Sequence, residues 1–264
     1  TPIGNLADMS QRAIEMLRAA DLIAVEDSRV TGKLLHHLGL KKRMRPYHDH
    51  SSEADRDALL AVARDGVVVL VSDAGTPLIS DPGYKLVRAA REAGIAVSTA
   101  PGASAVIAAL SISGLPTDRF LFAGFLPSKA KARSDAIAEI GNVKSTLVFY
   151  ESGQRLGAAL AALAEQLGGR EAVVARELTK KFEEVVSGTL PELAERYAEA
   201  EPKGEIVLIV GPPGEVQAEQ GDYESALKDA LQTLPPAKAA KEIAKRFGVD
   251  RAEVYERAMA LKRS

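Results

Sequence analysis

The stretch VVVLVSDAGTPLISDPG at residues 67–83 decides the fold class, because an apolar run leads straight into a long polar loop. The run from Val67 to Ser72 does not alternate between apolar and polar residues, which is typical of a parallel strand buried on both faces. We therefore expect this strand in the middle of its sheet. A plain strand-to-helix connection needs about 2–6 residues, and this loop is clearly longer. Loops at this position line the ligand crevice of open α/β sheets, which predicts a binding wall. The alternative is a turn in which Asp73 and Asp81 only satisfy backbone N–H groups.

Helical patterns closed by glycine alternate with short strand-like runs on both sides of this stretch. The first half predicts further strands at 22–25 and 95–99, and helices that begin near Ser10, Ser52 and Tyr84, with an alanine-rich helix ending at Ser113. After Gly114 the predicted strands are 120–125, 146–150, 172–176, 185–188 and 206–210. The fold class is α/β. We expect an N-terminal α/β domain at 1–116, a C-terminal α/β domain at 117–213 and a small helical extension, like a helix-turn-helix, at 222–264.

A second loop of small residues, from Ala100 to Ala105, follows the strand predicted at 95–99. Small side chains let a ligand approach the backbone closely. Small residues are also common where a helix starts tightly against a sheet, so this loop alone is weak evidence for a binding site. It becomes informative together with the loop at 72–83. Two successive strand ends are expected to flank one cleft.

Composition limits the possible functions of the chain. Its 264 residues carry a formal net charge of −2, so any nucleic-acid contact must come from a local basic patch. The absence of cysteine removes disulfides, thiolate metal sites and cysteine nucleophiles, and favours a cytoplasmic protein. No apolar run approaches the ~20 residues that span a bilayer. The P-loop, zinc-protease, serine-hydrolase and Rossmann glycine motifs are also absent.

Two polar segments carry candidate acid–base chemistry. Glu26-Asp27-Ser28-Arg29 follows the strand at 22–25 and supplies carboxylates beside a guanidinium, but a local Asp27–Arg29 ion pair with Ser28 as helix cap is an equal alternative. His48-Asp49-His50 suits either a substrate-facing loop or a solvated surface. A metal site there is not expected, because neighbouring side chains on a strand point to opposite faces.

Several of these segments together resemble one known family. They are TPIGNL at 1–6, EDSR at 26–29, the loop at 72–83, PGAS at 101–104, SGLPTD at 113–118, GFLP at 124–127, FYES at 149–152, RELTK at 176–180 and KGE at 203–205. In this order they look like the ribosomal RNA small subunit methyltransferase I family of the tetrapyrrole methylase superfamily. The resemblance covers nearly the whole chain.

The resemblance implies an S-adenosyl-L-methionine-dependent 2'-O-methyltransferase that modifies the ribose of a cytidine in the decoding region of 16S rRNA, within the small ribosomal subunit. It also implies two α/β domains with the cofactor cleft between them, and a homodimer. The cofactor residues carried over by motif are Pro2, Gly4, Asp73, Gly75, Thr76, Ser104, Ala105, Tyr150, Leu178 and Val210. A tetrapyrrole or other small acceptor, or a non-catalytic ribosome-binding assembly factor, are the alternatives.

The chemistry of methyl transfer to a ribose hydroxyl suggests further roles. A group that accepts the hydroxyl proton would help, and the candidates are Asp27, His48 and Glu151; no metal is required. For RNA phosphates we expect Arg29, Lys129, Lys131 and Arg133. The basic residues of the helical extension suit either RNA or a dimer or domain contact.

The family pattern has one feature that this sequence does not show. A strand is usual immediately before TPIGN, and here nothing precedes Thr1. We expect the first sheet to be short of a central member. Ser28 and Ser51 also stand where Thr and Asn are usual, and both are mild changes.

Overall fold

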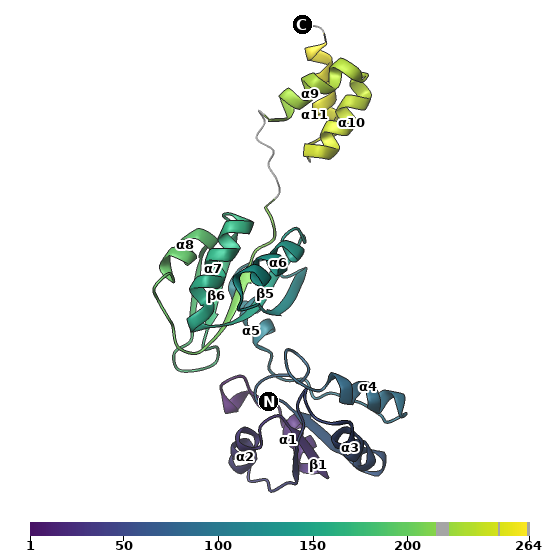
Figure 1. Cartoon of the computed structure of the whole chain (residues 1–264), viewed down its shortest axis with the longest axis vertical. Helices are drawn as coiled ribbons and strands as arrows, with labels where there is room; N and C mark the ends of the chain where they lie inside the picture. Colours follow the sequence, from purple (N-terminus) through teal and green to yellow (C-terminus); the bar gives the residue numbers. More distant parts are fainter. Residues whose placement is uncertain (215–221, 248, 263–264) are drawn as a thin grey trace. The chain divides into compact units, whose positions relative to one another are not determined.

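The computed structural model describes residues 1–214, 222–247 and 249–262, and the chain forms two compact units. One unit contains residues 1–141 and 145–211, and the other contains residues 142–144 and 212–264. Both predicted α/β domains belong to the first unit, and each has its own sheet (Figure 1). No helix in the described residues is both long and apolar enough to cross a membrane.

The first sheet has three parallel strands in the order β2-β1-β3. The strands are β1 (Leu22–Val25), β2 (Met44–Pro46) and β3 (Val68–Val71). The connecting helices are α1 (Gln11–Ala19), α2 (Ser28–His37), α3 (Glu53–Asp65) and α4 (Tyr84–Glu92), with a short 3-10 turn at Leu6–Asp8. Local signals place these helices well, because Ser10 caps α1 and Ser52 forms a capping box with Asp55 at the start of α3.

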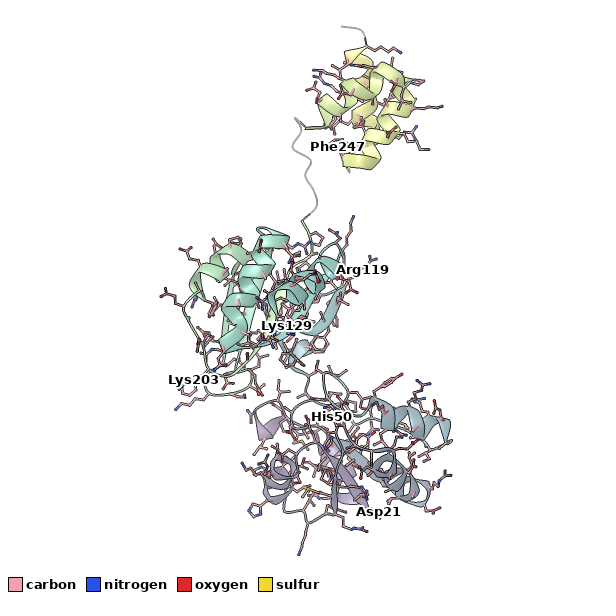
Figure 2. All side chains as sticks on the ribbon, in the orientation of Figure 1. Asp21, His50, Arg119, Lys129, Lys203 and Phe247 are labelled. Carbon is pink, nitrogen blue, oxygen red and sulfur yellow. The ribbon has the colours of Figure 1, made fainter. Side chains whose placement is uncertain are left out.

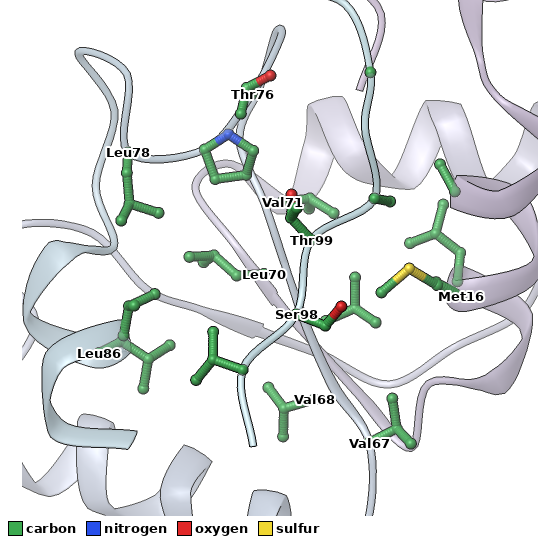
Figure 3. A pocket seen from close by; sticks show the side chains of 18 of the residues that line it. Met16, Val67, Val68, Leu70, Val71, Thr76, Leu78, Leu86, Ser98 and Thr99 are labelled. Atoms are coloured by element: carbon green, nitrogen blue, oxygen red, sulfur yellow. The ribbon is translucent and has the colours of Figure 1, made fainter. Parts of the chain in front are cut away.

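Two expectations for this sheet are wrong. The strand at 67–72 was expected in mid-sheet, but β3 lies at the edge and pairs only with β1 among the described residues. Residues 95–99 were expected to form a strand and have no regular secondary structure. An apolar cavity of about 400 Å³ separates them from β3, with Met16, Leu70 and Leu86 among the side chains around it (Figure 3). In the part of the chain that the structure describes, neither the outer edge of β3 nor residues 95–99 has a ladder partner.

The second sheet has five strands in the order β4-β5-β8-β6-β7, and only β4 and β5 run parallel. The strands are β4 (Phe120–Phe125), β5 (Thr146–Ser152), β6 (Glu171–Arg176), β7 (Glu184–Thr189) and β8 (Glu205–Val210). Helices α6 (Ala130–Ile140), α7 (Gly153–Leu167) and α8 (Leu190–Arg196) follow β4, β5 and β7. Leu156 and Leu160 of α7 pack with Phe149 and Leu208 in the larger core of this unit.

Helix α5 (Ala105–Ser113) joins the two α/β halves of the first unit. Its sequence AVIAALSIS has no charged residue, so it can bury more than one face. Val106 and Leu110 pack against Val148 and Val207 of the second sheet, together with Ile3 from the start of the chain. This helix therefore fixes the loop at 100–105 against the second sheet.

The second unit is a three-helix arrangement of α9 (Asp222–Thr233), α10 (Pro236–Phe247) and α11 (Arg251–Leu261). It has its own hydrophobic core, in which Leu227, Ile243 and Val254 are buried. Asp250 caps α11 by accepting hydrogen bonds from the backbone N–H groups of Ala252 and Glu253. The predicted helical extension is confirmed, whereas most of the linker predicted before it lies outside the described residues.

Candidate active site

Three loops that are far apart in the sequence meet beside α5. The hydroxyl of Thr1 donates hydrogen bonds to the carbonyl oxygens of Ser72 and Gly75, each at 3.0 Å. The N–H of Gly75 in turn donates to the carbonyl of Pro2 at 3.2 Å. The hydroxyl of Thr76 donates to the carbonyl of Ala103 at 3.1 Å. The loops at 72–83 and 100–105 are therefore adjacent, as predicted, and the first residues of the chain join them.

These loops face the second sheet across a cavity of about 290 Å³, which we call the interloop cavity. The loop side contributes Ile3, Ala74, Gly75, Thr76, Ile79, Ser80, Asp81, Ser104 and Ala105. The sheet side contributes Phe125, Tyr150, Glu151, Ser152, Leu178, Gly204, Glu205, Ile206 and Val207. The lining thus combines aliphatic walls with exposed backbone and a small number of carboxylates, which is the usual composition of a small-molecule site.

The N-terminus of α5 opens into this cavity. Ser104 is the N-cap residue, but its side chain makes no capping hydrogen bond. The first N–H groups of a helix lack intrahelical partners and carry a partial positive charge. One of them, from Val106, is directed at the hydroxyl of Tyr150. The wall beside Ala105 therefore favours a negatively charged or hydrogen-bond-accepting ligand group.

Glycine is required at position 75 of the same wall. Its φ of +77° lies in the left-handed region, which side chains rarely adopt. The resulting turn brings Gly75 close to Ile3 and Ala103. The backbone of the loop thus forms part of the cavity surface.

Two carboxylates that line the interloop cavity have raised pKa values. Burial and, next, the nearby charge of Glu26 raise the pKa of Asp81 to about 6. Burial likewise raises the pKa of Glu151, against the opposing effects of a hydrogen bond from the N–H of Ser152 and the charge of Arg155. The Nε atom of Arg155 lies 3.2 Å from a carboxylate oxygen of Glu151. Both acids can therefore hold or accept a proton nearer to neutral pH than an exposed carboxylate.

The predicted cofactor residues divide between two cavities. Gly75, Thr76, Ser104, Ala105, Tyr150 and Leu178 line the interloop cavity. Pro2, Gly4 and Asp73 line a neighbouring cavity of about 320 Å³ that also contains Thr1, Lys180 and Glu205. Val210 lines neither cavity; it is fully buried in the core and lies opposite Leu147 and Ala172 in the sheet, so its side chain has no access to a ligand there.

Asp73 also has a structural role in its loop. Its carboxylate accepts a hydrogen bond from the N–H of Asp27 at 3.1 Å, and its own N–H donates to the carboxylate of Glu26 at 3.3 Å. The sequence left open that Asp73 only satisfies backbone N–H groups of its turn. The hydrogen bond from Asp27 is a contact of this kind. Asp73 still lines the cavity beside Pro2 and Gly4.

Asp27 and His48 do not reach either of these two cavities. Asp27 caps α2 by accepting a hydrogen bond from the N–H of Arg29 at 2.7 Å, and its carboxylate forms an ion pair with the same residue at 2.6 Å. Hydrogen bonds from the Arg29 side chain lower the pKa of Asp27 to about 2. His48 lies on an exposed loop and contacts Ser51. Of the predicted proton acceptors, the structure brings only Glu151 to the site.

The predicted RNA-binding residues differ in how free their charges are. Arg29 is paired with Asp27, and Lys131 is paired with Asp135 at 2.8 Å. Arg133 is half-buried and donates to the carbonyl of Ser128 at 3.2 Å. Lys129, labelled in Figure 2, is exposed and forms no ion pair with any residue that the structure describes. Lys129 is thus the most available of these cations.

Sequence reasoning did not assign Asp81 and Phe125 to the site. Asp81 lies in the polar loop that is predicted to be a binding wall, and it lines the interloop cavity. Phe125 ends a strand whose sequence, FLFAGF, contains a glycine, which is a sign of a bulge. No cluster of three or more potential metal ligands occurs in the described part of the chain.

The fold and the site define a class of protein. Residues 1–194 match the model of the tetrapyrrole (corrin/porphyrin) methylases, and residues 217–262 match that of the RsmI C-terminal HTH domain. The crystal structure of diphthine synthase superposes with a TM-score of 0.62 at 18% identity, covering 80% of this chain and 87% of that one. Uroporphyrin-III C-methyltransferase from Thermus thermophilus, complexed with S-adenyl homocysteine, gives a TM-score of 0.53 at 22% identity, covering 80% and 94%.

A curated relative is much more similar in sequence. The ribosomal RNA small subunit methyltransferase I of Erythrobacter litoralis (strain HTCC2594) is 54% identical over 99% of this chain and 93% of its own length. The chain belongs to the ribosomal RNA small subunit methyltransferase I family, within the tetrapyrrole methylases.

Proposed function

We propose that this chain is an S-adenosyl-L-methionine-dependent methyltransferase that modifies the 2'-oxygen of a cytidine ribose in the decoding region of 16S rRNA. The observation that carries the proposal is the interloop cavity, in which three loops, the start of α5 and two carboxylates with raised pKa values meet. A relative named as a ribosomal RNA small subunit methyltransferase is 54% identical over 99% of this chain, which supports the proposal.

The lining of the interloop cavity fits the proposed cofactor. The start of α5 at Ala105 suits the carboxylate of its amino-acid part. Asp81 suits its ammonium group, and the aliphatic walls formed by Leu178 and Val207 suit its adenosine. When bound, the cofactor supplies an electrophilic methyl group on a sulfonium. The protein must align this group with the acceptor oxygen and exclude water, and positioning of this kind supplies about 7–11 kcal/mol.

The ribose hydroxyl is a poor nucleophile until its proton leaves, so a nearby carboxylate assists the reaction. Glu151 and Asp81 both line the cavity, and burial brings their pKa values closer to neutrality. Asp27 is unsuitable because its pKa is about 2 and Arg29 already occupies its carboxylate. We assign proton acceptance to Glu151, because Asp81 is assigned to the ammonium group of the cofactor.

The remaining parts of the proposal concern the setting of the reaction. We propose that the enzyme acts on the assembled small subunit in the cytoplasm, as a homodimer, and without a metal. Lys129 would contact a phosphate of the RNA. It follows the Phe125 end of β4, is exposed, and forms no ion pair with any residue that the structure describes.

A labelled-methyl assay tests the function directly. The chain is incubated with labelled cofactor and, in separate reactions, with purified small subunits, naked 16S rRNA and a tetrapyrrole acceptor. We expect label in the RNA of the small subunits, located on a ribose after nuclease digestion. Transfer to the tetrapyrrole alone would favour a small acceptor, and failure to bind the cofactor would favour a ribosome-binding factor without catalysis.

The position of the cofactor has its own test, which uses two substitutions on α5. Ala105→Asp places a negative charge in the cavity, while an acidic residue in the first turn stabilises a helix. It should weaken binding of S-adenosylhomocysteine by tenfold or more in calorimetry without unfolding the protein. Ser111→Asp, at an exposed position of the same helix outside the cavity, is the matched control and should leave affinity unchanged.

A further inference from the structure

Strand β4 has a β-bulge just before it ends at the interloop cavity. From Phe122 to Phe125 the strand advances three residues, whereas its partner β5 advances only two, from Val148 to Tyr150. Gly124 lies inside this irregularity with a φ of +64°, a conformation that glycine adopts without strain. A bulge interrupts the alternation by which successive side chains of a strand point to opposite faces of the sheet. The side chain that follows this bulge is Phe125, which lines the interloop cavity.

The ring of Phe125 is held on one side and free on the other. It makes an edge contact with Tyr150, with ring centroids 5.6 Å apart at an interplanar angle of 60°. Phe122 also contacts Tyr150, with ring centroids 4.8 Å apart. Phe122 and Tyr150 both pack against the core that contains Val106 and Leu110 of α5, and Phe125 is not part of that core. Phe125 is 55% exposed. Core packing therefore accounts for Phe122 and leaves the exposed face of Phe125 without a partner among the described residues.

The segment after Phe125 is fixed in place. Leu126 is buried, and its carbonyl accepts a hydrogen bond from the guanidinium of Arg155, which also forms the ion pair with Glu151. A rigid neighbour lowers the entropy that an aromatic ring loses when a ligand binds to it. The Phe125 ring is consequently preorganised beside a carboxylate that lines the same cavity.

We propose that Phe125 is the stacking platform for the base of the nucleotide whose ribose is methylated. This inference rests on the proposed function. A nucleotide whose ribose enters the cavity must bring its attached base to the cavity mouth, unstacked from its neighbours. Proteins hold such bases against aromatic side chains. Phe125 and Tyr150 are the aromatic residues of the cavity lining, and Tyr150 is already packed between Phe122 and Phe125.

Substitutions at position 125 test this role in the full-length enzyme with small subunits as substrate. Removing one stacked base contact, as in Phe125→Ala, should raise the KM for small subunits about 10–100-fold. Phe125→Leu should do the same, because it keeps an apolar side chain and removes the aromatic face, whereas Phe125→Tyr should restore near-native values. In Phe125→Ala and Phe125→Leu the KM for small subunits should rise much more than the KM for the cofactor, because Leu178 and Val207, the walls assigned to the cofactor, are unchanged. The matched control is Phe120→Ala on the same strand, where a ring that is 43% exposed lies outside the cavity.

A binding measurement makes the test independent of turnover. The chain contains no tryptophan, so Phe125→Trp and the control Phe120→Trp each create a single fluorescent reporter. We expect small subunits to quench the reporter at position 125 and to leave the one at position 120 nearly unchanged.

Three results would overturn the proposal. The first is an unchanged KM in Phe125→Ala. The second is quenching of the position-125 reporter by S-adenosylhomocysteine alone, which would place the ring in the cofactor site. The third is quenching that depends only on protein concentration, which would place it against a second copy of the chain. A wild-type enzyme that labels no RNA would instead contradict the proposed function. The two failures can be told apart, because the quenching experiment needs no methyl transfer.

Discussion

Two aspartates of the first unit have pKa values displaced in opposite directions. The carboxylate of Asp27 forms an ion pair with the guanidinium of Arg29, and hydrogen bonds from that guanidinium lower the pKa of Asp27 to about 2. Asp81 is partly buried in the interloop cavity near Glu26 and Asp73, and its pKa rises to about 6. Neighbouring charge and burial therefore decide which carboxylate can accept a proton. The residue type alone does not.

The raised pKa of Asp81 predicts a pH-dependent cost in stability. Because the folded protein holds this proton more tightly than the unfolded chain, the stability associated with Asp81 is full below about pH 4 and declines as pH rises through about 6. Asp81→Asn removes the charge. We expect the variant to be more stable than wild type at pH 7.5, by about 1 kcal/mol after allowance for solvent screening of a half-exposed group.

Urea denaturation at pH 4 and pH 7.5 measures this effect. The difference between variant and wild type should appear at pH 7.5 and be small at pH 4, where both side chains are neutral in the folded protein. Equal stability of the two proteins at the higher pH would show that the charge of Asp81 is well solvated in the folded state.

At the level of elements, the approach of α7 to the segment before β8 depends on glycine. A Cβ atom at Gly153, the first residue of α7, would lie 1.5 Å from the carbonyl oxygen of Pro202. That oxygen belongs to the backbone and cannot rotate away. The close approach matters for the site because β5 ends in the cavity residues Tyr150 and Glu151 just before this helix begins.

We therefore expect Gly153→Ala to destabilise the protein by about 3 kcal/mol or more, as overpacking against backbone does. Gly169→Ala is the matched control, because a Cβ atom there has no neighbour within 4 Å. Its effect should be near zero or slightly stabilising. The midpoints of urea denaturation of the two variants check the prediction. Similar midpoints would mean that the segment around Pro202 moves aside at little cost.

At the level of the whole molecule, the two units have separate hydrophobic cores. The residues that line the interloop cavity end at Val207, and α9, α10 and α11 build their own core around Leu227, Ile243 and Val254. Exposed Lys238 and Lys241 on α10 suit contacts with RNA phosphates, though Glu242 lies beside them. Cofactor binding should therefore not depend on the helical unit.

A chain that ends at Gly211 tests this separation. We expect it to bind S-adenosylhomocysteine with a Kd within about twofold of the full-length value, because every lining residue of the cavity is retained. Calorimetry gives the Kd, and circular dichroism confirms that the shortened chain is folded. A tenfold loss of affinity in a folded protein would show that the helical unit contributes to the cofactor site.

The sequence by itself determined the features that depend on local chemistry. Patterns within a few residues predict the helix starts at Ser10 and Ser52 and the strands of the second sheet. They also predict the polar loop at 72–83 and the loop of small residues at 100–105. The motifs at residues 1–6, 72–83 and 176–180 also identified the family, because they join unusual residue types in a fixed order.

Only the tertiary structure decided which side chains share a site. The bonds that place Thr1 against Gly75 join residues 74 positions apart, and no local pattern encodes them. Asp81 lines the cavity, while Asp27 lies outside it, paired with Arg29. Local propensity acts within a turn or a strand, whereas the site is set by packing between segments distant in the sequence.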